Sequence, residues 1–186
     1  FLTGMNAVIY DINLITTAST EAAEKQVFGL TLLILLLAFG SFTGALLPLL
    51  MAIVSMLISL SIVAVIARFT MVSTYAQSIS SMIGLAVGID YALLLVWRLR
   101  QEREKGQELK VALHQTILTA GKSVIFAGGT FLIGLAGLFF SGITALFSIG
   151  LGGILVVMVS VAASLTLLPA LLLVLGPWLD FPKTNK

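Results

Sequence analysis

The sequence contains no cysteine, and only 10% of its 186 residues are charged. The absence of cysteine excludes a disulfide framework and any metal site built on thiolates. Charged residues make up about 25% of a typical soluble domain, so this chain lacks the polar surface that would have to cover a soluble core. The shortage of charge therefore argues against a soluble globular domain.

Charge is missing from two long blocks of the chain. Residues 26–67 hold no Lys, Arg, Asp or Glu over 42 positions, and residues 123–179 hold none over 57. A helix needs about 20 apolar residues to cross a bilayer, so each block is long enough for two crossings. A fifth apolar stretch carries a single charge, and we predict an all-α membrane protein, a bundle of five transmembrane helices. The expected spans are approximately residues 26–42, 46–67, 78–97, 122–141 and 144–175.

Three segments flank or connect these spans, and the spans lie within a transmembrane domain over residues 19–176. Residues 1–18 mix polar and β-branched side chains and are expected to be the end of an extramembrane domain. Residues 98–121 form a charged loop, and residues 177–186 form a polar tail. The chain begins at Phe1 without an initiator methionine, so we expect it to be a piece of a longer protein.

Orientation follows from the distribution of Lys and Arg, which favour the cytoplasmic side. The segment 98–122 and the tail together hold eight of them, whereas the opposite side holds only Lys25 and Arg68. The sequence therefore predicts a multi-pass protein of the cell membrane with an extracytoplasmic N-terminus and a cytoplasmic C-terminus. The eight residues are Arg98, Arg100, Arg103, Lys105, Lys110, Lys122, Lys183 and Lys186.

The basic loop has two interpretations, a nucleic-acid site or a topology determinant. Leu109, Leu113 and Ile117 recur at spacings of four with polar residues between them, which is typical of an amphipathic helix on a membrane surface. This pattern favours the bilayer as the partner and not a nucleic acid. His114 lies in the loop without companions that could form a metal site, and we assign it no role.

Asp90 is the one acid inside a predicted span, in the sequence GLAVGIDYALLLVWR. A carboxylate at the centre of a membrane helix costs about 2.5–3.5 kcal/mol on insertion scales. Eight residues separate Asp90 from Arg98, which places it about 12 Å inside the cytoplasmic boundary. Such an acid normally faces a bundle interior or a wet cavity and marks an ion or proton path. The alternative is a protonated Asp that only hydrogen-bonds a neighbouring helix.

Several residues near Asp90 are candidates for supporting roles. Tyr91 follows directly, and we expect both side chains to reach toward a second helix, although Tyr91 could equally serve in packing. Gly84 and Gly88 form a small-xxx-small pattern that permits close helix contact. Ser123 and Thr130 on the fourth span could donate hydrogen bonds nearby, or could bond within their own helix.

Enzymatic function has little support in this sequence. We find no Ser-His-Asp set, no paired acids and no HExxH motif. The glycine-rich segment AGGTFLIG at residues 127–134 lacks the Lys-Ser or Lys-Thr of a phosphate-binding loop. We therefore predict a protein that is not an enzyme, with no cofactor and no bound metal.

The segment GIDYALLLVWRLRQE at 88–102 resembles the Gly-x-Asp-Tyr motif and basic exit of the fourth transmembrane helix in the MMPL family. That family belongs to the resistance–nodulation–division (RND) superfamily. ALHQTILTAGKSVIFAGGTFLIGLAGLFF at 112–140 is similar to its fifth-helix entry, and FGSFTGALLPLL at 39–50 to its second-to-third helix turn. FLTG at the start is similar to the end of its extracytoplasmic porter domain.

The resemblance implies that the five spans are helices two to six of one RND-type repeat that lacks its first helix. It also implies that Asp90 and Tyr91 form half of a proton relay, completed by a matching pair from a second transporter half or another protomer. The implied function is export of lipids or other hydrophobic molecules, driven by the proton gradient.

Two alternatives remain open at this point. The same five-helix unit resembles sterol-sensing domains, which bind lipid and regulate partners, and the Asp90-Tyr91 pair favours the pump over them. The other alternative is a protein-export accessory of the same superfamily.

Overall fold

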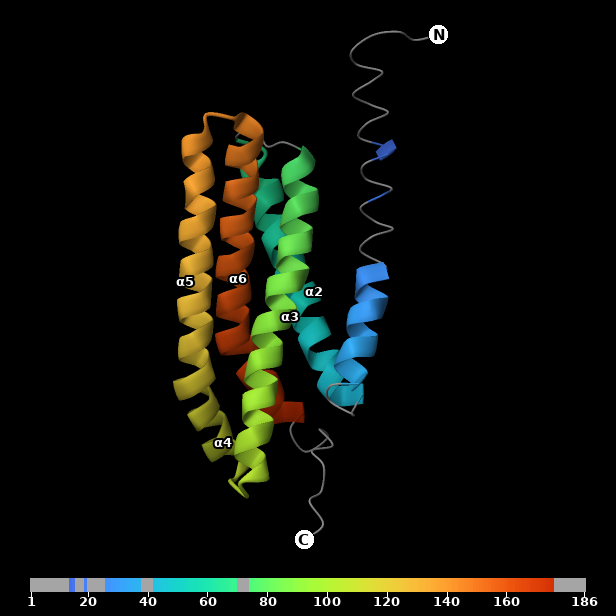
Figure 1. The fold of residues 1–186 in the computed structure, drawn as a ribbon, viewed down its shortest axis with the longest axis vertical. Coiled ribbons are helices and arrows are strands. Elements are labelled where there is room, and N and C mark those ends of the chain that lie inside the picture. The colour runs from blue at the N-terminus through green and yellow to red at the C-terminus, as the bar shows by residue number, and fades with distance from the viewer. Residues whose placement is uncertain (1–13, 16–18, 20–25, 38–41, 70–73, 176–186) are drawn as a thin grey trace.

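The structure is a computed structural model that describes residues 14–15, 19, 26–37, 42–69 and 74–175. All regular elements in these ranges are helices, and long helices run side by side as a bundle (Figure 1). The predicted all-α membrane fold is therefore confirmed. The expected extramembrane end at 1–18, apart from Leu14 and Ile15, and the expected tail at 177–186 lie outside the described residues.

Within the described ranges, four helices are long and apolar enough to cross a membrane, and a shorter apolar helix, Gln26–Leu37, precedes them. The third of the four is continuous from Leu109 to Ser141 but changes its winding along its length. The elements are α2 (Phe42–Ile66), α3 (Thr74–Glu104), α4 (Leu109–Thr116), the π-helical turn η1 (Ile117–Gly121), α5 (Lys122–Ala136), the 3₁₀ turn η2 (Gly137–Ser141) and α6 (Thr144–Leu175).

The segment expected to be a loop, residues 98–121, is mostly helical. Helix α3 continues to Glu104, and a reversal at Gly106, with φ of +82°, leads into α4. Leu113 and Thr116 of α4 are buried, and α4 packs against α3. The apolar side of α4 thus contacts the helix bundle, whereas the sequence pattern led us to expect an interfacial helix on the membrane surface.

Helices α2, α3 and α6 form the centre of the bundle, where small residues permit close approach. A Cβ on Gly88 of α3 would lie 2.8 Å from the Cα of Ala52 on α2. A Cβ on Gly84 would lie 2.9 Å from a methyl group of Val156 on α6. Glycine is therefore required for the contact at Gly88, because the obstructing atom belongs to a backbone.

Helix α5 lies on the outside of this centre and packs mainly on α6 (Figure 1). A tight turn precedes α6, with Gly142 in the left-handed region at φ of +70°. Many outward-facing side chains on this hairpin are apolar, and Phe126 and Phe140 are 76% and 91% exposed. A surface of this kind is suited to contact with lipid or with other membrane helices.

The contact at Gly88 leads to a prediction for stability. Gly88→Ala in the full-length protein should lower the free energy of unfolding by about 1–3 kcal/mol, because the methyl group meets the backbone of α2. Gly134→Ala is the matched control, since nothing lies within 4 Å of the Cβ it would add. Thermal unfolding of the detergent-purified variants compares the two. Equal midpoints would show that α2 and α3 do not depend on this contact.

Candidate functional site

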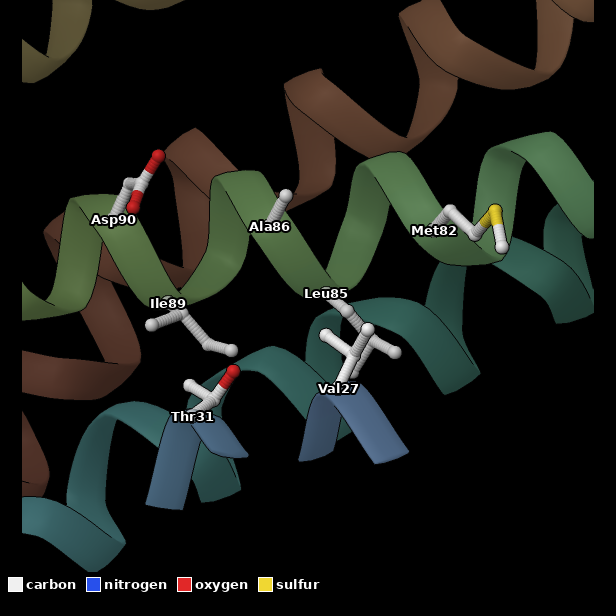
Figure 2. A pocket seen from close by; sticks show the side chains of 7 residues that line it. All are labelled: Val27, Thr31, Met82, Leu85, Ala86, Ile89 and Asp90. Atoms are coloured by element: carbon white, nitrogen blue, oxygen red, sulfur yellow. The ribbon is translucent and has the colours of Figure 1, made fainter. Parts of the chain in front are cut away.

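Asp90 lies near the middle of α3 and is the only charged residue between Thr74 and Trp97. Asp90 is one of the residues that line a cavity of about 360 Å³ between α3 and the helix Gln26–Leu37, and it is exposed in the part of the chain that the structure describes. Figure 2 shows Asp90 at one end of the row of lining side chains and Met82 at the other. The lining residues are Val27, Thr31, Met82, Leu85, Ala86, Ile89 and Asp90.

The chemistry of this cavity is one acid in an otherwise mostly apolar setting. Among the described residues that line the cavity, Thr31 is the only one besides Asp90 that brings a polar side-chain group to the wall. Thr31 was missed by the sequence reasoning, although it is the single hydroxyl residue in the run VFGLTLLILLLAF at 27–39. Among the described residues, Asp90 thus has a single polar neighbour at this cavity.

The Tyr91 side chain is directed into the bundle. Its side chain is buried, and its hydroxyl lies 3.5 Å from the position that a Cβ on Gly128 of α5 would take. Val161 of α6 contacts the same position. The two adjacent side chains thus approach different helices, because neighbouring positions on a helix are about 100° apart. The structure therefore differs from our expectation that the Asp90 and Tyr91 side chains reach toward the same second helix.

Gly128 is the second residue that the sequence reasoning missed. A larger residue there would meet Val161, whose methyl carbon lies 2.6 Å from the modified position, and would crowd the Tyr91 hydroxyl. The signal was present in the paired glycines of AGGTFLIG, which we considered only as a possible phosphate loop. The glycine makes room for a phenol at the junction of α3, α5 and α6.

The remaining candidates fall into two groups. Gly84 and Gly88 lie six and two residues before Asp90, on the side of α3 that packs against α2 and α6. Thr130 donates a hydrogen bond to the carbonyl of Phe126 in its own helix, at 2.9 Å. Ser123 is exposed near the start of α5, about 7.5 Å along the helix from the level of Gly128.

No metal centre is evident in the part of the chain that the structure describes. Three or more His, Asp or Glu side chains do not come together anywhere in those residues. The acids Glu102 and Glu104 are instead paired with Arg98 and Arg100 at the end of α3. The candidate site is therefore Asp90 with its cavity, together with the Tyr91 hydroxyl on the other side of α3.

Sequence similarity relates the chain to one protein family. The model of the MMPL family matches residues 1–186. The chain is 30% identical over 179 residues to the trehalose monomycolate exporter MmpL3 of Mycolicibacterium smegmatis, which covers 96% of this chain and 18% of the relative. It is 32% identical over 161 residues to the mycolic acid-containing lipids exporter MmpL11 of the same organism, covering 87% and 17%.

A relative from a different group of bacteria gives the same result. The membrane protein YdfJ of Bacillus subtilis is 36% identical over 157 residues, which covers 84% of this chain and 22% of that protein. The chain thus spans about a fifth of the length of these curated relatives. Because the family model matches from the first residue to the last, the chain belongs to the MMPL family.

Proposed function

We propose that this chain forms part of a transporter that exports lipids or other hydrophobic molecules and is driven by the proton-motive force. The observation that carries the proposal is Asp90, a lone carboxylate in the middle of a membrane helix, beside an apolar cavity. An acid in this setting is costly and normally marks a proton or ion path. The relatives MmpL3 and MmpL11 are named as lipid exporters, which favours export over a sterol-sensing regulatory role.

In this proposal Asp90 takes up a proton on one side of the membrane and releases it on the other. Moving one charge through 100 mV supplies about 2.3 kcal/mol, which a protonatable carboxylate can couple to a change in helix packing. Tyr91 takes part as the second group of the relay, with its hydroxyl held at the junction with α5 and α6. A matching pair from a second transporter half or another protomer completes the relay.

The proposal also assigns an orientation. The end of α3 and the start of α4 lie on the cytoplasmic side, because the segment 98–122 carries six Lys and Arg residues. Trp97, which is 54% exposed, marks the interface at that end. The turn at Gly142 then lies on the extracytoplasmic side, since the helix Leu109–Ser141 separates the two.

Orientation can be tested with single cysteines, because the chain has none of its own. Glu108→Cys and Ile143→Cys are suitable, since both residues are exposed and neither has a positive φ. In a full-length protein freed of other cysteines, an impermeant thiol reagent should label position 143 in intact cells. Position 108 should react only after the membrane is opened, and labelling of 108 in intact cells would reverse the orientation.

Asp90→Asn separates proton exchange from packing, because the amide has nearly the same shape as the carboxylate. The variant should insert and fold at least as well as the parent, since a neutral amide is less costly to bury than a carboxylate. Gradient-dependent export by the full-length protein in proteoliposomes should nevertheless fall to background.

Two further variants control this experiment. Asp90→Glu keeps an exchangeable proton and should retain part of the activity. Glu108→Gln neutralises an exposed acid outside the predicted spans and should leave export unchanged. Export at the parental rate by the Asn variant would make Asp90 a structural residue and would remove the basis for proton coupling.

Tyr91→Phe tests the second group of the relay. The phenyl ring fills the same buried space, so expression should be unchanged. The free energy of unfolding should remain within about 0.5 kcal/mol of the parent value. Export should be impaired because the hydroxyl facing Gly128 is lost. If the Tyr91→Phe variant exports at the parental rate in proteoliposomes, Tyr91 serves in packing alone.

A further inference from the structure

A cluster of polar side chains joins α3 to the π-helical turn η1 at the α4 end of the bundle. The Arg98 Nε donates a hydrogen bond to the Thr119 Oγ1 at 3.2 Å. The Arg98 Nη2 lies 2.8 Å from the Glu102 Oε1, and the Lys105 Nζ lies 2.8 Å from the same oxygen. Arg98 is thereby held in one place on the surface, with its side chain one-third exposed.

Positive charge is in excess at this cluster. Residues 98–122 contain six Lys and Arg residues and three Glu residues, a net charge of +3 with His114 neutral. Within the cluster, Glu102 is one acid between the two cations Arg98 and Lys105. Lys122 adds a third cation three residues after Thr119, is exposed, and makes no ion pair within the described residues.

The residue that accepts the hydrogen bond from Arg98, Thr119, lies in the π-helical turn η1. Thr119 is the middle residue of η1, and short π-helical turns inside α-helices are frequent at functional sites. Its hydroxyl donates to the carbonyl of Gln115 at 2.8 Å and so presents a lone pair to Arg98. Residues three or four apart share a helix face, which places Lys122 and the exposed Ser123 beside Thr119.

Exposed apolar side chains begin one turn deeper on the same two helices. Leu94 on α3 is 37% exposed and precedes Arg98 by four residues. Ile125 and Phe126 on α5 are 55% and 76% exposed and follow Lys122 by three and four residues. Cations and hydroxyls at the level of the headgroups, next to an apolar surface, match the two parts of a phospholipid.

We propose that Arg98, Thr119, Lys122 and Ser123 bind the phosphate of an anionic phospholipid, whose acyl chains lie along Leu94, Ile125 and Phe126. Arg98 uses three of its five N–H groups within the protein if its contacts with Thr119, Gln101 and Glu102 are counted, so two remain for a phosphate oxygen. The occupant is a lipid and not a soluble anion, because the polar cluster adjoins lipid-facing side chains. The inference does not depend on whether Asp90 carries protons.

The test compares lipid binding by the full-length protein and its Lys122→Gln variant, by native mass spectrometry. The probes are phosphatidylglycerol and phosphatidylcholine with the same acyl chains. One cation near a membrane surface contributes about fivefold in affinity for an anionic lipid. We expect Lys122→Gln to weaken phosphatidylglycerol binding about fivefold and to leave phosphatidylcholine binding unchanged.

Lys110→Gln is the matched control, because it removes the same charge from the same continuous helix, about 18 Å away along its axis. It should leave phosphatidylglycerol binding unchanged. Thr119→Val removes the hydroxyl while keeping the shape of the side chain and the net charge of the protein. It should nevertheless weaken phosphatidylglycerol binding.

Three results would overturn the inference. The first is the absence of any preference of the parent protein for phosphatidylglycerol. The second is an equal loss in the Lys122→Gln and Lys110→Gln variants, which would indicate general attraction by net charge. The third is displacement of the lipid by inorganic phosphate at equal concentration, which would make the cluster a site for soluble anions.

Discussion

The contact between Gly88 and Ala52 determines how close α3 can come to α2, and much of the bundle depends on it. A Cβ at Gly88 would lie 2.8 Å from a backbone atom, so the two helices could not keep their present separation with any other residue. The hydrophobic effect does not drive helix association within a bilayer, where close packing and polar contacts hold helices together. Small residues at Gly84 and Gly152 extend the same type of contact from α3 to α6.

This packing leaves α3 with two different sides at the level of the candidate relay. Asp90 borders the cavity shared with the helix Gln26–Leu37, whereas Tyr91 is buried toward Gly128 and Val161. A change in the charge of Asp90 therefore acts on the helix that also positions Tyr91. In the proposed mechanism, proton uptake at Asp90 alters the contacts that α3 makes with α5 and α6.

The end of the bundle near α4 combines ion pairs with two irregular turns of the backbone. Glu102 fixes Arg98 and Lys105 by ion pairs at 2.8 Å, and Arg98 reaches across to η1. The reversal at Gly106 and the π-helical turn are the two irregular points between α3 and α5. An anionic lipid bound there would stabilise the position of α3, which carries Asp90 and Tyr91, and that of α5, which contacts Tyr91.

The amino-acid sequence by itself determined the membrane character and the order of the helices, and it singled out Asp90 as a candidate, because uncharged runs and a lone intramembrane acid are local signals. Only the tertiary structure decided which side chains meet. Thr31 and Gly128 join the site through contacts between helices that are far apart along the chain. The burial of Leu113 against the bundle likewise depends on how α4 docks on α3. An amphipathic pattern is the same for a helix that faces lipid and for one that faces protein, so the sequence could not distinguish them.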